Sequence, residues 1–394
     1  MPELATKSST GRRDRRGADE RADLRERVLR SLENQGFQLE DDGRLAPAPA
    51  GKEAIRALHA SARHASIERA RDGLRRHEDR LLGHFAAGAD LDVQAIRPRL
   101  VEVAAGSEEE LLFRYARLHW SIPVSAGYGR RLRFLIVDEA NDKLIGLFGL
   151  GDPVFAIGPR ERWIGWDWDA RKARLRHVMD AFLLGAVPPY SSLLCGKLVA
   201  MLMTSSEVRR AFKRKYGGSD SLITNRLFDG NLALITTTSA LGRSSVYNRV
   251  RVGDRRLLQS VGFTSGSGEF HFANGIYRDL IGYADANLQP TAKHIRWGGG
   301  WRNRREVVRR TLPELGLSSE MIYHGVQREL FVAPLAPNTR EFLCGQHKHL
   351  RPYKAPAAAL FDAFRARWLL PRAERDRRYR DFDPNSLRIW TGAR

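Results

Sequence analysis

The stretch Leu132–Leu150, LRFLIVDEANDKLIGLFGL, contains two apolar runs on either side of the polar segment Asp138–Asp142. Two such runs joined by a short polar turn predict a β-hairpin, and with it the start of a sheet. On the N-terminal side, from about Arg21 to Arg117, apolar residues recur at helical spacing between charged residues. The stretch therefore marks a change from a helical region to a sheet.

Strand and helix signals alternate after this hairpin. A strand is predicted to end at Pro188–Pro189, a helix with a basic last turn at Gly217–Gly218, and a further strand lies in Leu232–Val250. A second hairpin is predicted with Ser265–Gly268 as its turn, and a helix over Gly275–Asn287. The region is thus expected to form a layered structure of helices and strands.

The order of elements from about Leu132 to His271 resembles that of the GNAT acetyltransferases. We therefore expect an α/β (α+β) fold with a GNAT-like mixed sheet. The expected segments are a basic flexible tail (1–20), a helical accessory domain (21–117), the GNAT-like core (118–290) and a basic, mixed C-terminal region (291–394).

The charge of the chain points to a polyanionic partner. Among 394 residues, 66 Lys and Arg face 46 Asp and Glu, which gives a formal net charge of +20. More than half of this excess lies from Lys293 onward, so the C-terminal quarter is expected to contact a phosphate backbone. Nucleic acid, with DNA favoured, is the predicted partner.

Cysteine usage and apolar runs bear on the compartment. The chain has two cysteines, distant in sequence, which suits a reducing compartment. Its apolar runs are too short for a membrane span, and its basic N-terminus lacks the apolar core of a secretory signal. We expect a cytoplasmic protein. The sequence identifies no cofactor.

Three residues are candidates for catalysis. Tyr247 follows a predicted core strand and precedes Gly262–Phe263, the position at which GNAT-like enzymes can carry a proton-donating tyrosine. Asp152, at a strand end, could act as a general base, and His271 is a weaker candidate base. The alternatives are a packed tyrosine with a local hydrogen bond and an ordinary turn aspartate before proline.

Two loops are candidates for ligand binding. Arg243, Ser244 and Ser245 combine guanidinium and hydroxyl donors in a flexible turn that could clamp an anion. The other loop would correspond to the GNAT pyrophosphate loop, but it departs from the glycine-rich pattern of that superfamily. A solvent-facing arginine and a plain serine helix cap are the alternatives. The candidates in the second loop are Tyr190, Ser191 and Ser192.

Tryptophans and arginines interleave in Arg160–Asp169, RERWIGWDWD, a mixture suited to stacking on bases and gripping phosphates. At least one of its three tryptophans is expected to be a core residue. Cys344, His347 and His349 lack the further ligand of a zinc site, so no metal is predicted. The candidate nucleic-acid-binding residues are Arg162, Trp163, Trp166, Arg302, Arg304 and Arg305.

Several longer strings resemble the DruA family, which is associated with Druantia anti-phage defence and has relatives near mobile elements. They are WSIPVSAGYGRRLRFLIVDEANDKLIGLFGLGDPVF, RERWIGWD, LALITTTSALGRSSVYNRV, VGFTSGSGEFHF and HGVQRELFVAPLAPNTREFL. The resemblance runs from about Trp120 to Leu343. It implies a cytoplasmic protein of antiviral defence that works beside a helicase-like partner on invading nucleic acid.

Three hypotheses follow. The first is a defence protein with a GNAT-like core that modifies or processes DNA. Such a protein could be a GNAT-like transferase acting on nucleic acid. The second is a non-catalytic module that recognises DNA for a helicase-type partner. The third is a transposase-associated protein of a mobile element, for which the sequence shows no acidic triad.

Overall fold

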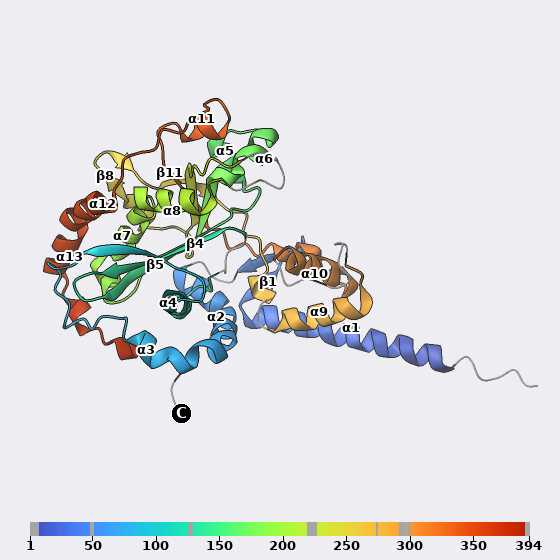
Figure 1. The fold of residues 1–394 in the computed structure, drawn as a ribbon. Helices are drawn as coiled ribbons and strands as arrows, with labels where there is room; N and C mark the ends of the chain where they lie inside the picture. Colours follow the sequence, from blue (N-terminus) through green and yellow to red (C-terminus); the bar gives the residue numbers. More distant parts are fainter. Residues whose placement is uncertain are drawn as a thin grey trace, which may run out of the picture. The chain divides into compact units, whose positions relative to one another are not determined.

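The chain folds into two compact units, each built from several stretches of sequence (Figure 1). The computed structural model describes residues 8–47, 51–124, 129–218, 227–272, 275–290, 297 and 301–390. The units interleave along the sequence, so neither coincides with one of the four consecutive segments expected. Unit 1 comprises Met1–Arg69, Ser121–Pro123 and Ser265–Gln327, and unit 2 comprises Ala70–Trp120, Val124–Thr264 and Arg328–Arg394.

Unit 2 is organised around a seven-stranded mixed sheet, in the order β10-β11-β7-β6-β5-β4-β3. The pairs are antiparallel except β6 and β7, which are parallel. This arrangement confirms the predicted α/β class. The strands are β3 (Pro98–Glu102), β4 (Arg131–Asp138), β5 (Lys143–Gly151), β6 (Val178–Ala186), β7 (Leu234–Thr238), β10 (Gln259–Phe263) and β11 (Glu329–Pro334).

The predicted hairpin is confirmed as β4 and β5. Their register runs from Arg131↔Gly151 to Asp138↔Lys143, and the turn lies in the expected polar segment. Phe134 and Phe148 pair across the strands with ring centroids 5.0 Å apart. Since β5 is buried along almost its whole length, it reads as a continuous apolar run and lies inside the sheet.

Helices cover the sheet, and α7 is the most deeply buried of those described. It packs on β6 and β5 and is covered in turn by α12. The predicted helix end at Gly217 is also confirmed, because α8 stops at Tyr216. The helices of unit 2 are α3 (Glu78–Leu82), α4 (Glu108–Ala116), α5 (Gly158–Ile164), α6 (Trp168–Arg174), α7 (Cys195–Leu202), α8 (Ser206–Tyr216), α11 (Thr339–Leu343), α12 (Ala357–Phe364) and α13 (Leu370–Arg375).

One expectation about the sheet is wrong. The turn predicted at Ser265–Gly268 does not join two strands, because β10 pairs with β11, and Phe270–Phe272 forms a 3-10 helix. The strand β11, which follows residue 290, lies between β10 and β7 in the sheet. The difference arises because the partner of β10 lies far along the chain. A short two-stranded ribbon, β8 (Arg251–Val252) and β9 (Arg255–Arg256), lies between β7 and β10 in sequence.

Unit 1 is mainly helical and has its own apolar core, to which Val28, Leu280 and Val307 contribute. The flexible tail expected over residues 1–20 is instead helical from Ser8. Arg, Glu and Ala favour helix, so the element extends well beyond the apolar residues that anchor it. The elements are α1 (Ser8–Asn34), β1 (Phe37–Leu39), β2 (Leu45–Pro47), α2 (Lys52–Leu74, which continues into unit 2), α9 (Ile276–Asn287) and α10 (Trp301–Glu314).

Candidate functional site

The parallel strands β6 and β7 remain paired over a short distance. Their register ends at Asp180↔Thr236, although β6 continues to Ala186. The Thr236 hydroxyl donates to Oδ1 of Asp180 at 2.6 Å, and burial raises the pKa of this carboxyl. Ligands of open α/β sheets bind beyond the carboxyl ends of parallel strands, so the segments that follow β6 and β7 form the first candidate region.

Tyr190, which follows β6, is fully buried. Its hydroxyl donates to Oδ2 of Asp138 at 2.9 Å and accepts from the Asn141 side-chain amide at 3.0 Å. Burial also raises the pKa of the Tyr190 hydroxyl. These contacts use the hydroxyl to fix the turn between β4 and β5, which leaves it poorly suited to hold a ligand.

Ser191 and Ser192 are exposed beside Tyr190. Neither caps α7 as the alternative interpretation expected, because this helix begins at Cys195 with Leu194 as its N-cap residue. Leu194 adopts a left-handed conformation with φ 63°, which turns the chain into the helix. The Ser192 carbonyl accepts from Nε of Arg372 at 3.0 Å, so this segment is tied to the C-terminal helices.

The loop after β7 directs part of its polar groups inward. The Ser244 backbone N–H donates to Oε2 of Glu329 at 3.0 Å, and the Ser244 hydroxyl accepts from the Tyr247 N–H at 3.2 Å. Arg243 and Ser245 are exposed, and both remain available to a ligand. Of the three candidates in this loop, Ser244 is therefore a structural residue.

Glu329, at the start of β11, was not predicted. It is 6% exposed, and its Oε1 accepts from the Ser260 hydroxyl at 2.7 Å. Its two carboxylate oxygens thus join β10 to the loop after β7. No sequence signal distinguishes it, because a glutamate before an apolar strand is usually a surface residue.

Tyr247 packs against the sheet. Its ring meets that of Phe331 edge to face, with centroids 5.2 Å apart. Burial raises the pKa of Tyr247 to about 12, so its hydroxyl stays protonated at neutral pH. The side chain can donate a proton or a hydrogen bond there, but it is not a base.

Lys197, in α7, lies near Val246, the residue before Tyr247. It was not among the predicted site residues. The side chain is buried, with 7% exposure, and its Nζ donates to the Val246 carbonyl at 3.3 Å. Burial lowers the pKa of Lys197, and the positive charges of Arg249 and Arg367 lower it further. The sequence carried a signal, because this lysine interrupts the apolar run LLCGKLVAMLM.

Asp152, the expected general base, is held by Arg130. Nε of Arg130 donates to Oδ1 at 2.7 Å, and the Arg130 N–H donates to Oδ2 at 3.0 Å. Because Gly151 pairs with Asp180, Asp152 lies at the end of the sheet where β6 begins. Tyr247 instead follows the opposite, C-terminal end of β7. The two side chains do not converge on one site.

His271 belongs to unit 1, whereas Tyr247 belongs to unit 2. It is fully buried in a 3-10 helix, and its Nε2 lies 3.0 Å from the Met321 carbonyl. Burial holds the pKa of His271 well below its usual range, so the ring is neutral. The residue is not on a strand, so its ring does not project from a face of a sheet.

The three tryptophans of Arg160–Asp169 differ in burial. Trp166 is a core residue whose indole N–H donates to the Glu161 carboxylate. Trp163 is half-buried beneath Arg340, whose guanidinium carbon lies 5.7 Å from its ring centroid. Arg162 is exposed on α5. Trp166 is therefore unsuited to stack on a base, while Arg162 can reach a phosphate.

The exposed ring of this run is Trp168, with 59% exposure at the start of α6. Phe155 meets it edge to face at 5.0 Å between centroids. The guanidinium carbon of Arg171 lies 4.6 Å from the Phe155 centroid and 4.9 Å from that of Trp168. We call Phe155, Trp168 and Arg171 the Trp168 surface. Helix α6 carries it close to α11 (Figure 1).

The basic candidates near residue 300 lie in α10 of unit 1. Arg304 is exposed, with its guanidinium carbon 5.5 Å from the ring centroid of Tyr277. Arg305 is half-buried, and its charge acts on Glu269. Arg302 is in the first turn of α10, and its side chain lies outside the described residues. Of the described side chains among these candidates, Arg304 is the one exposed to solvent.

The described part of the chain brings no three His, Cys, Asp or Glu side chains together as a metal site. Within the same residues, no helix combines the length and apolar character needed to cross a membrane. The predicted absence of a metal remains a prediction.

Comparison with known proteins identifies a family. The family described as "Druantia protein DruA" matches residues 49–345. A curated relative from Escherichia coli (strain UMEA 4076-1), also described as "Druantia protein DruA", is 39% identical over 360 residues, which cover 91% of this chain and 89% of the relative. No solved structure matches the chain.

Proposed function

Because this chain belongs to the DruA family of Druantia anti-phage proteins, we propose that it acts in defence by binding nucleic acid through the Trp168 surface. DNA is the favoured partner. The observation that carries the proposal is the large exposed ring of Trp168, held beside Phe155 and Arg171.

The chemistry of the Trp168 surface fits an unpaired base. Stacking of a base on an aromatic ring contributes about 1–3 kcal/mol, and it tolerates any sequence. Phe155 meets the indole edge to face and the Arg171 guanidinium lies over its ring, so little side-chain freedom remains to be lost on binding. The exposed part of the Trp168 ring is then available to a base.

Charge supports the same partner. The net charge of +20 favours association with a polyanion. Close to the Trp168 surface in sequence, Arg162 and Lys172 are exposed on α5 and α6 and could contact phosphates. Phosphate contacts supply affinity without sequence preference, and a stacked base adds a requirement for single-stranded or flipped-out nucleotides.

Binding of a labelled single-stranded oligonucleotide to Trp168→Ala tests the proposal. We expect an affinity about tenfold weaker than that of the parent, equal to loss of one stacked base. Trp168→Phe, which keeps a flat ring, should retain most of the affinity. Equal affinities for all three proteins would overturn the assignment of this surface.

A second candidate function is group transfer to nucleic acid by a GNAT-like core. It is favoured by the buried Lys197 and the protonated Tyr247 beyond the paired part of β6 and β7. Tyr247→Phe should then abolish defence while oligonucleotide binding persists. Defence that survives this substitution would leave a binding role, in which the protein presents DNA to a helicase-type partner.

A further inference from the structure

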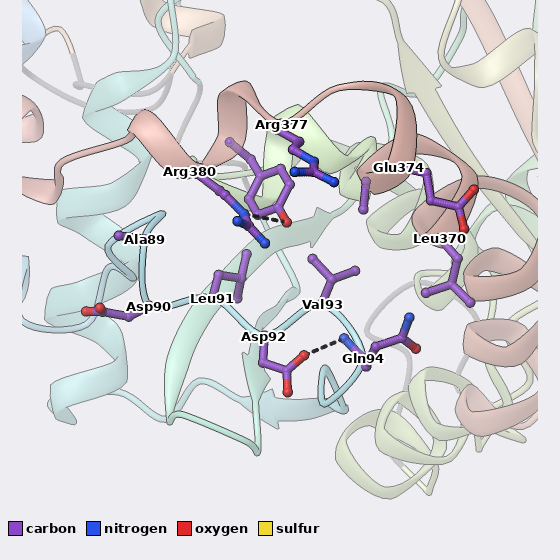
Figure 2. A pocket seen from close by; sticks show the side chains of 12 residues that line it. Ala89, Asp90, Leu91, Asp92, Val93, Gln94, Leu370, Glu374, Arg377 and Arg380 are labelled. Carbon is purple, nitrogen blue, oxygen red and sulfur yellow. Dashed lines mark hydrogen bonds between the residues drawn. The ribbon is translucent and has the colours of Figure 1, made fainter.

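A cavity of about 470 Å³ lies between two segments of unit 2 that are distant in sequence (Figure 2). One wall is the loop from Ala89 to Gln94, and the other runs from Leu370 in α13 to Arg380 in the 3-10 helix that follows. This volume is typical of sites for small molecules. None of the candidate residues considered above lines it.

The two walls are fixed to each other. The Gly88 N–H donates to the Phe382 carbonyl at 2.8 Å, and a Cβ at Gly88 would lie 1.9 Å from the Tyr379 carbonyl oxygen. On the other side, Arg365 donates to the backbone and side-chain oxygens of Gln94, both at 3.0 Å. The cavity is therefore preformed, which lowers the entropic cost of binding.

Arg365 begins a π-helical turn, Arg365–Leu369, between α12 and α13. Such turns are rare and are frequent at functional sites. Here the turn places Arg365 against the loop and leads directly into α13, which forms the opposite wall. The π-helical turn thus helps to position both walls of the cavity.

The cavity has an apolar floor. Leu91 and Val93 are buried, with 6% and 7% exposure, and Leu370 and Ala373 face them from α13. Figure 2 shows the side chains of Leu91, Val93 and Leu370 directed toward the space between the walls. A flat, weakly polar group such as a nucleobase could be buried between them.

Two arginines on one wall have no acidic partner among the residues that the structure describes. The Asp376 carboxylate forms ion pairs with the guanidinium groups of Arg372 and Arg378, each at 2.6 Å. Arg377 and Arg380 form no ion pair with any side chain in the described ranges, and Nε of Arg380 contacts the Tyr379 hydroxyl at 3.4 Å. Both lie on the same side of the cavity (Figure 2).

The acidic side chains of the lining lie farther from these arginines. Asp92 accepts from the Gln94 N–H at 2.9 Å and so fixes its own loop. Figure 2 shows Asp90 and Glu374 at opposite edges, away from the guanidinium groups of Arg377 and Arg380. One end of the cavity is therefore cationic, and its floor is apolar.

We propose that this cavity binds a nucleoside phosphate. The base lies over Leu91, Val93 and Leu370, and the phosphate accepts hydrogen bonds from Arg377 and Arg380, whose planar guanidinium groups match phosphate oxygens. The ligand is either a free nucleotide or the 5′-phosphorylated end of a strand. The inference is independent of the Trp168 surface.

Calorimetric titration of the full chain with deoxyadenosine 5′-monophosphate tests the proposal. We expect saturable binding that weakens at least about tenfold in Arg377→Ala/Arg380→Ala. Arg375→Ala is the matched control, because Arg375 is an exposed arginine at the end of α13, two residues before Arg377, and its Nε donates to the Pro371 carbonyl. It should bind like the parent. All three arginines are exposed, so the substitutions should leave the fold intact. Thermal unfolding of each variant checks this.

Further ligands distinguish the sources of the phosphate. Tighter binding of a 5′-phosphorylated single strand than of its 5′-hydroxyl counterpart, lost in the double variant, would identify a strand end. Equal binding of the two strands with retained nucleotide binding would identify a free nucleotide. Absence of nucleotide binding, or inorganic phosphate bound as tightly as the nucleotide, would overturn the proposal. Trp168→Ala should not alter nucleotide affinity, so failure here is separable from failure at the Trp168 surface.

Discussion

The loop after β7 and the Trp168 surface are both built from aromatic and polar residues, yet they use them in opposite ways. In the loop, Ser244 bonds to Glu329 and Tyr247 packs on Phe331. At the surface, Trp168 keeps more than half of its area exposed while Phe155 and Arg171 brace it. Hydroxyl groups of the loop are thus used in internal hydrogen bonds, whereas the exposed ring of Trp168 remains available to a ligand.

The largest expected effect comes from a substitution beneath the loop after β7. Phe331→Ala removes a fully buried ring beneath Tyr247 and should lower the free energy of unfolding by about 4 kcal/mol, the usual cost of such a cavity. Urea unfolding measures the loss. Oligonucleotide affinity of the folded protein should stay within about twofold of the parent, since the substitution does not touch the Trp168 surface. A large loss of affinity in the folded protein would show that the two regions are coupled.

Acid should also destabilise the fold, through the buried side chain of His177. Burial lowers the pKa of His177 from 6.5 to about 4, while Nδ1 lies 2.8 Å from the Asn231 carbonyl. The unfolded chain therefore binds the proton more tightly than the folded chain. The contribution of His177 to stability is complete above pH 6.5 and falls as the pH drops toward 4, by about 3 kcal/mol.

Comparison with His177→Gln isolates this contribution, because other buried groups titrate in both proteins. Between pH 7 and pH 4, urea unfolding of the variant should show a smaller loss of stability than that of the parent. Identical losses would contradict the inferred state of His177.

A smaller effect is expected from Glu329→Ala. The substitution leaves the Ser260 hydroxyl and the Ser244 N–H without their acceptor, at a cost of about 2 kcal/mol in the free energy of unfolding. Glu329→Gln, which keeps one acceptor oxygen, should lose less. If Glu329→Ala retained full stability but lost defence activity, the carboxylate would belong to a functional site and the contrast between the two regions would fail.

Local signals in the sequence predicted part of the fold. The hairpin of β4 and β5, the end of β6 before Pro188 and the end of α8 at Tyr216 each depend on neighbouring residues and were correct. The pairing of β10 with β11 was not predictable, because the stretch Ser265–Gln327, which belongs to unit 1, separates the two strands. A chain that leaves one unit and returns to it gives no local sign of doing so.

The same distinction applies to the candidate site. Residue types pointed to a tryptophan-rich segment, but burial decided which ring is exposed, and Trp166 and Trp168 are separated by only one residue. Lys197 could have been found as a charge within an apolar run. The contacts of Asp152 and Tyr190 could not be predicted from the sequence. Arg130 meets Asp152 only when β4 and β5 pair, and Asp138 meets Tyr190 only when β6 joins the same sheet.

The smallest expected effect concerns Arg162, which is exposed on α5 near the Trp168 surface in sequence. If its guanidinium contacts one phosphate, Arg162→Ala should weaken oligonucleotide binding uniformly across sequences and reduce the salt slope of log affinity by about 1. Stability should change by less than about 0.5 kcal/mol, because the side chain lies at the surface. Trp168→Ala should instead weaken binding while leaving the salt slope unchanged, since stacking releases no counterions. Measuring both variants over a range of salt concentrations would separate the ionic from the stacking part of the surface, and an unchanged slope in Arg162→Ala would remove Arg162 from the interface.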